Sequence, residues 1–172
     1  MSNRGEIMKT LPEFKTILYT TDLGENTRPV FRTALSLAKA YEAQIIMLHV
    51  VEPMTSAMQA VVDTYLPAGE AKKVYQDGMK SVLNEMKSRL QKFCDEEFES
   101  PEALQGLVKD IIVVSGRTSE EILKTAQKQQ ADIIVMGKST RSVFGSDVSG
   151  SSTRRVSRHS TIPVLMVPNV SG

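Results

Sequence analysis

Three largely apolar runs, each separated from the next by a segment with helical periodicity, constrain the fold of this chain most strongly. They are Ile45–Leu48, Val108–Val114 and Ile133–Met136. Strands that are buried on both faces have nearly continuous apolar sequences, whereas strands with one face in solvent alternate apolar and polar residues. Because such runs alternate here with helices, the sequence predicts a doubly wound α/β domain with a parallel sheet covered on both faces.

The segments around these runs predict two more strands and four helices. Residues 16–20 and 163–167 predict the first and last strands, and the second strand extends over 44–51. After the first strand, apolar residues at i, i+3, i+4, i+7 and i+10 predict a helix with one face on the sheet. These residues are Phe31, Ala34, Leu35, Ala38 and Tyr41. Five strands with four helical segments indicate the flavodoxin-like or Rossmann-like class.

Spacing and residue type predict three further details. Residues 72–97 form a long amphipathic helix, in which Cys94 is buried or half-buried. Thr118 and Glu121 have the spacing of a capping box at the start of another helix. The segment 52–70 has no clear period, and it forms either a lid over a ligand or an irregular surface that packs on the domain or on a partner.

Composition narrows the class of protein. With 172 residues, of which 41% are hydrophobic, we expect a polar tail at 1–13, one domain over 14–168 and a short tail at 169–172. A net charge of +1 and the absence of tryptophan argue against a nucleic-acid partner. The single cysteine excludes an internal disulfide and a multi-cysteine metal site. Because no run reaches the length of a membrane span and the start lacks a secretory signal, we expect a cytoplasmic protein without a membrane partner.

A loop with glycine and hydroxyl residues follows the last of the three apolar runs. Met136-Gly137-Lys138-Ser139-Thr140 ends that run, and Gly150 opens a short basic helix with Ser151, Ser152 and Thr153 at its start. Free backbone N–H groups of such a loop, together with a helix N-terminus, can hold an anion. The hydroxyl groups either cap the helix or donate to phosphate oxygens, and the residues alone leave both roles open.

The spacing Gly137-x2-Thr140-x9-Gly150-Ser151 resembles the nucleotide loop of the universal stress protein family, G-x2-G-x9-G-[S/T]. The similarity extends from about Phe14 to Val167. It includes Ile17–Asp22, Leu48-His49-Val50, Gly116 with Glu120-Glu121-Ile122, and His159 with Pro163–Val167. The resemblance implies strand order 3-2-1-4-5, an adenine nucleotide alpha hydrolase-like fold, and a homodimer formed through the last strand, about Pro163 to Val167.

The same resemblance implies a set of binding residues. It places an adenine or ribose contact at Asp22, whose alternative role is to cap the next helix. Thr20 and Thr21 line the same pocket, and Val50 offers an apolar wall to adenine or is simply part of the strand core. The implied phosphate loop comprises Met136, Gly137, Thr140, Gly150, Ser151, Ser152 and Thr153. The expected ligand is ATP, with Mg, while AMP or no nucleotide remains open.

One position departs from the family pattern, because Thr140 stands where the family has its second glycine. A β-branched residue is strained at positive φ, so a loop that needs such a conformation would be reshaped or bind more weakly. Lys138 and Arg141 lie within the loop and are the basic residues best placed to meet phosphate.

Other nucleotide-binding classes do not match. A Walker A motif requires glycine where Asp132 stands, and the first strand is not followed by G-x-G-x-x-G. His49 and His159, the only histidines, lack neighbours for a catalytic triad or a metal site. We therefore favour a stress-response protein that binds an adenine nucleotide as a sensor or regulator. The alternatives are a dimeric interaction protein without nucleotide and a slow ATP hydrolase.

Overall fold

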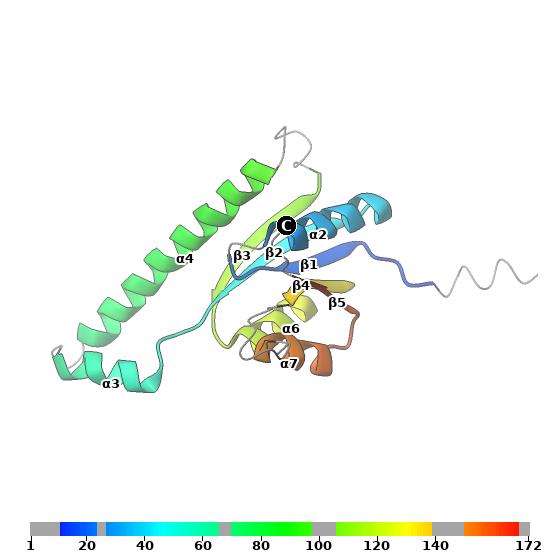
Figure 1. The fold of residues 1–172 in the computed structure, drawn as a ribbon. Helices are drawn as coiled ribbons and strands as arrows, with labels where there is room; N and C mark the ends of the chain where they lie inside the picture. Colours follow the sequence, from blue (N-terminus) through cyan, green and yellow to red (C-terminus); the bar gives the residue numbers. More distant parts are fainter. Residues whose placement is uncertain (1–10, 24–26, 66–69, 98–105, 139–149, 169–172) are drawn as a thin grey trace, which may run out of the picture.

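The computed structural model describes residues 11–23, 27–65, 70–97, 106–138 and 150–168. Its centre is a five-stranded parallel sheet with the order β3-β2-β1-β4-β5 (Figure 1). The strands are β1 (Thr16–Thr20), β2 (Gln44–Val51), β3 (Val108–Ser115), β4 (Ile133–Lys138) and β5 (Val164–Pro168). The predicted fold class, strand number and strand order are confirmed.

Helices cover both faces of this sheet. Helices α2 (Arg28–Tyr41) and α4 (Glu70–Glu97) lie on one face, and α6 (Thr118–Lys128) and α7 (Ser151–His159) lie on the other (Figure 1). Neighbouring residues of β1 divide between the two layers, since Ile17 and Tyr19 belong to the core under α2 and Leu18 to the core over α6. A strand buried on both faces explains why its sequence does not alternate. Within the described ranges, no helix is long and apolar enough to cross a membrane.

The prediction of four helical segments was wrong, because a further helix, α3 (Ser56–Tyr65), occupies most of the segment 52–70. The sequence at the start of this helix contains an N-cap residue, which the irregular spacing of the apolar residues obscured. The Thr55 hydroxyl accepts a hydrogen bond from the Met58 backbone N–H at 3.3 Å, as an N-cap residue does. No glycine or proline interrupts the ten residues that follow.

The predicted capping box at the start of α6 was also wrong. Arg117 is the N-cap residue, and no side chain caps the helix there. The Thr118 hydroxyl instead donates to Glu52 Oε1 at 2.8 Å, which connects α6 to the residue after β2. Glu121 does not reach back to the N-cap because its side chain lies over Gly116 and pairs with Lys124 at 3.4 Å.

The apolar stripe predicted for α2 meets the sheet at most of its positions. Phe31, Ala34 and Ala38 are fully buried. Tyr41 differs, because 44% of it is exposed. As the last residue of the helix it contacts Phe14 edge-on, with ring centroids 5.1 Å apart, instead of the sheet.

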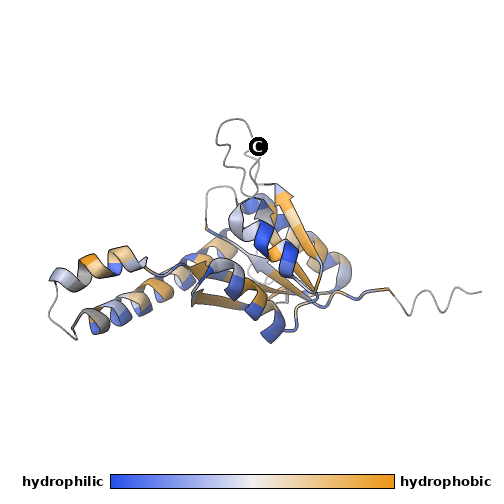
Figure 2. Ribbon diagram, turned by 90° about the horizontal axis from the view of Figure 1, so that it is seen from below, coloured by the Kyte–Doolittle hydropathy of each residue, from blue (hydrophilic) through white to orange (hydrophobic). Residues whose placement is uncertain are grey.

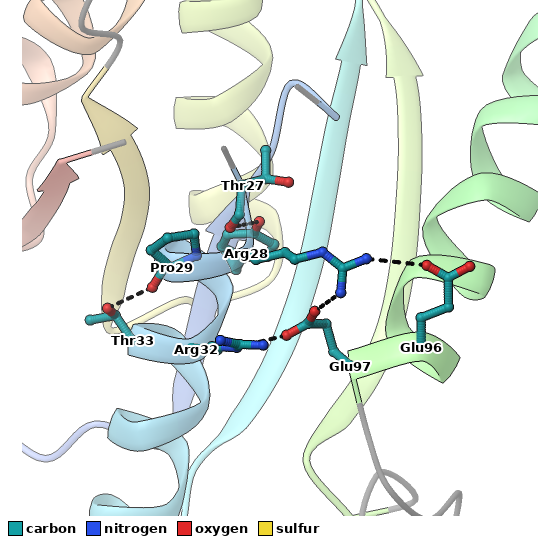
Figure 3. A network of polar contacts seen from close by, with 8 residues as sticks. Thr27, Arg28, Pro29, Arg32, Thr33, Glu96 and Glu97 are labelled. Atoms are coloured by element: carbon teal, nitrogen blue, oxygen red, sulfur yellow. Dashed lines mark hydrogen bonds and ion pairs between the residues drawn. The ribbon is translucent and has the colours of Figure 1, made fainter. Parts of the chain in front are cut away.

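The C-terminal end of α4 is anchored, and the rest of this helix is not. Leu90 and Cys94 are its only buried side chains among those described, which confirms the expected burial of Cys94. Beside them, the nearly inaccessible Glu97 carboxylate pairs with both Arg28 and Arg32 of α2 (Figure 3). The Arg32 contact, from Nε to Glu97 Oε2, measures 2.9 Å. The described side chains of α4 before Leu90 are at most half-buried, and Met79, Leu83 and Met86 are among the half-buried ones.

We expect Gly78→Ala to stabilise α4 by about 1 kcal/mol, because glycine in a helix interior costs more backbone entropy than alanine. Gly78 lies within α4, and a Cβ atom added there would meet no atom within 4 Å. Hydrogen exchange of the α4 amides measures the effect. Gly116→Ala, between β3 and α6, is expected to destabilise the domain instead, since its Cβ would lie 2.6 Å from Glu121 Cγ, and urea unfolding measures that effect. Equal exchange in wild type and Gly78→Ala would contradict the expectation.

Candidate functional site

A cavity of about 400 Å³ opens at the carboxyl ends of β1, β2 and β4. Strand β1 pairs with both β2 and β4, so the chain leaves β1 toward one side of the sheet and β4 toward the other. Such a switch point leaves a crevice outside the strand ends, where open α/β sheets bind ligands. The lining residues are Tyr19, Thr20, Thr21, Asp22, Thr27, Val30, Leu48, His49, Val50, Thr118, Ile122, Met136, Gly137, Gly150, Ser151, Ser152 and Thr153.

Ten of the eleven binding residues expected from the sequence lie in this lining. They come from four separate places in the chain: the end of β1, the end of β2, the end of β4 and the start of α7. The eleventh, Thr140, lies outside the described residues, as does Arg141. Lys138 ends β4 and is half-buried, but it is not part of the lining.

The turn after β1 is held by its own threonine. The Thr21 N–H donates to the Leu48 carbonyl at 3.0 Å, which continues the ladder with β2 one residue beyond β1. The Thr21 hydroxyl accepts from the Leu23 N–H at 3.1 Å. Leu23 has a φ of 58°, a left-handed conformation that turns the chain sharply out of the sheet. Asp22 is therefore presented at the cavity by a turn fixed on both sides.

His49, at the end of β2, is half-buried and lines the cavity, although it was not among the binding residues expected from the sequence. Its Nδ1 lies 2.8 Å from the Thr21 carbonyl oxygen. Because a carbonyl only accepts, Nδ1 carries the proton and donates, which leaves Nε2 as the acceptor in the neutral ring.

The start of α7 faces the same cavity from the other layer. Gly150 is the N-cap residue, and the helix begins at Ser151 as expected. The Thr153 side chain is buried, and its hydroxyl donates to the Gly137 carbonyl at 3.5 Å, which ties the helix start to the end of β4. The first N–H groups of a helix have no partner within the helix, so their positive end points toward the cavity.

Tyr19 of β1 also lines the cavity. Its ring is fully buried and packs on Phe31, with ring centroids 5.1 Å apart. Burial raises the pKa of Tyr19 well above its usual range, so the hydroxyl stays protonated. It donates to the Thr27 carbonyl at 3.5 Å and thereby holds the N-cap residue of α2 beside the cavity.

The charges around the cavity are few. Among the described lining residues Asp22 is the only one with a formal charge. Arg154, Arg155 and Arg158 of α7 are exposed to solvent. No group of three or more acidic, histidine or cysteine side chains in the described residues is arranged to hold a metal ion. An anion here would thus meet backbone N–H groups and hydroxyl groups of α7 in the described part of the site.

This sheet order, with a cavity at its switch point and a helix N-terminus beside it, defines an α/β protein of the adenine nucleotide alpha hydrolase-like class. The chain belongs to the universal stress protein family, whose model matches residues 13–168.

Two similar sequences cover nearly the whole chain. The universal stress protein MJ0577 of Methanocaldococcus jannaschii is 29% identical over 158 residues, which are 90% of this chain and 94% of that protein. Its solved structure matches with a TM-score of 0.65 at 27% identity, over 92% of this chain and 99% of that one. A universal stress protein of Thermus aquaticus is 31% identical over 155 residues, 90% of this chain and 98% of that one.

A third similar protein is a universal stress protein solved in complex with cAMP. It matches with a TM-score of 0.55 at 18% identity, over 92% of this chain and 99% of that one. At this identity the likeness shows a shared fold.

Proposed function

We propose that the chain is a cytoplasmic stress-response protein that binds ATP or another adenine nucleotide in the switch-point cavity and acts as a sensor or regulator. One observation carries the proposal: the carboxylate of Asp22, the wall at Val50 and the N-terminus of α7 line the same cavity. Its volume of about 400 Å³ is within the range of small-molecule sites. The relative in complex with cAMP supports an adenine ligand.

The proposed pose follows from the chemistry of the lining. The adenine ring lies against Val50, and the Asp22 carboxylate accepts a hydrogen bond from an amino or ribose hydroxyl group. The phosphates lie at the start of α7, where backbone N–H groups and the hydroxyl groups of Ser151 and Ser152 donate to them. Thr153 is less available, because its hydroxyl already bonds Gly137.

Calorimetric titration of the nucleotide-stripped protein tests this function. Mg-ATP, AMP and cAMP are titrated at physiological salt, with Mg-GTP as the control for base selectivity. We expect saturable binding of about one adenine nucleotide per chain, because the cavity is a single site. GTP should bind much more weakly, because guanine has a carbonyl where adenine has the amino group that donates to Asp22 in the proposed pose. Absence of heat and of competition up to millimolar adenine nucleotide would overturn the proposal and favour the interaction protein without nucleotide.

We also propose a homodimer formed through β5. The two edges of the sheet differ in charge, since the β3 edge exposes Lys109 and Asp110 whereas β5 has no charged residue. Charged residues on an edge strand oppose pairing with another chain, and an uncharged edge favours it. Met166 of β5 is 43% exposed, an apolar side chain that a second β5 strand would cover.

Met166→Glu is expected to lower the weight-average mass at micromolar concentration by about twofold, because it places like charges opposite each other across a two-fold axis. Sedimentation equilibrium measures the mass. Lys109→Glu, on the other edge, is the matched control and should leave the mass unchanged. If Met166→Glu and Lys109→Glu both sediment like wild type, the last strand is not the interface.

A further inference from the structure

Helix α3 presents a stripe of apolar side chains to solvent. Met54, just before the helix, and Met58, Val61 and Tyr65 follow one another at spacings of four, three and four residues. Side chains at these spacings lie on one side of a helix. Their exposed fractions are 40%, 59%, 56% and 82%. The pattern is that of a core-facing helix, but the stripe faces water.

No described part of the chain covers this stripe. Every described side chain of α3 is exposed except that of Gln59, and within the described ranges no strand or helix packs extensively on α3. Helix α3 and the part of α4 before Leu90, here called the arm, project from the domain (Figures 1 and 2). Val74 and Val82 of α4 add exposed apolar surface to the arm.

We infer that the arm is a self-association surface, on which the apolar stripe of α3 packs against the same stripe of a second copy of this chain. The exposed apolar side chains of one arm offer roughly 600 Å² of surface, which approaches the ~800 Å² that each partner contributes to a standard interface. This area is at the upper end of the largest apolar patch of a typical monomer, about 300–600 Å², and patches of that size are often functional. Two helical arms that pair in this way form a small bundle with one shared core.

The charge of α3 favours a second copy over other occupants. Residues 56–65 include no lysine or arginine and one acidic residue, Asp63. Helices that lie on membranes carry basic residues on their polar face, which α3 lacks. A nearly uncharged stripe also has no electrostatic potential that would attract a charged partner. For the same reason, two copies of the stripe do not repel each other. A two-fold axis then makes the surface complementary to itself.

The arm contact is separate from pairing through β5. Helix α4 packs on β3, at one edge of the sheet, and β5 is the opposite edge. One copy can therefore use both contacts at once. The arm contact is also independent of nucleotide binding, because no residue of the stripe lines the switch-point cavity.

Site-specific cross-linking of the full chain tests the inference. Val61→Cys places a thiol in the middle of the stripe, and Ala60→Cys, which is also exposed, places one outside the stripe, about 100° around the helix axis from Val61. The only natural cysteine, Cys94, is buried and contributes little background. With a short bis-maleimide at micromolar protein, we expect at least about fivefold more covalent dimer from Val61→Cys than from Ala60→Cys, since only the first thiol meets its copy. Equal yields would overturn the inference.

Sedimentation gives a second readout that does not depend on a thiol. We expect the pair of substitutions Met58→Asp and Val61→Asp, made in the Met166→Glu background, to lower the weight-average mass by about twofold relative to that background. Both positions are exposed, so the changes leave the domain folded, as circular dichroism can verify. A mass unaffected by the two aspartates would mean that the arm does not pair with its copy and would overturn the inference.

Discussion

Ser152→Asp is expected to weaken the binding of an adenine nucleotide by about 100-fold, which corresponds to roughly 2.7 kcal/mol. Ser152 lies in the first turn of α7, is half-buried and lines the switch-point cavity. A carboxylate at this position accepts the same backbone N–H groups that would otherwise donate to phosphate. It also repels the phosphate charge, and two charges about 4 Å apart near a protein surface interact by about 4 kcal/mol.

The Ser152→Asp substitution is not expected to destabilise the fold. An acidic residue in the first turn interacts favourably with the helix dipole, and α7 has no acidic residue there now. Helix stability should therefore stay the same or rise slightly. The substitution is thus expected to lower nucleotide affinity without lowering helix stability. A loss of affinity could then not be attributed to unfolding.

Ser152→Asn is the matched control, since it has the size of aspartate without the charge. We expect it to change affinity by only a fewfold. Calorimetric titration with AMP measures both variants, and urea unfolding verifies their stability. Should aspartate and asparagine reduce affinity equally, size rather than charge would be the cause, and the phosphates would not lie at the start of α7.

The sequence predicted the central strands of this fold well, because β1, β2 and β4 are buried on both faces along most of their length. Strands β1 and β2 have the predicted bounds. In β1, Ile17 and Leu18 pack into opposite layers, so neighbouring positions are both apolar.

Helix α3 was missed although its signals are in the sequence, since Met58, Val61 and Tyr65 have helical spacing and Thr55 is the N-cap residue. Other apolar residues off this spacing, such as Val62, obscured the period.

The candidate site was predictable where one strand end carries several of its residues. Thr20, Thr21 and Asp22 are consecutive, so placing β1 at the switch point places all three. His49 and Thr118 could not be found in this way. His49 reaches the cavity through its bond to the Thr21 carbonyl, and Thr118 lines it while bonding Glu52. Such contacts depend on which helices and strands pack together. The spacing of residues along the chain does not determine this.

Alkylation of Cys94 in the folded protein should be about 1000-fold slower at pH 8 than in the urea-unfolded chain, because the thiolate is the reactive form. Cys94 is only 1% exposed, and its Sγ lies 3.0 Å from Met47 Sδ. Burial, followed by the neighbouring Asp95 charge, raises the pKa of Cys94 to about 12, against 9.0 for an unperturbed thiol. Iodoacetamide labelling followed by mass spectrometry gives both rates, and similar rates would show that the C-terminal end of α4 opens readily.

The same pKa difference predicts a loss of stability at alkaline pH. The unfolded chain releases the thiol proton near pH 9 and the folded chain only near pH 12, so the unfolded state binds fewer protons between these values. The free energy of unfolding is therefore highest below about pH 9 and falls as the pH rises toward 12. The raised pKa of Tyr19 acts in the same direction. Cys94→Ala should flatten the decline in urea-unfolding midpoints between pH 8 and 10, and an unchanged slope would assign the decline to other groups.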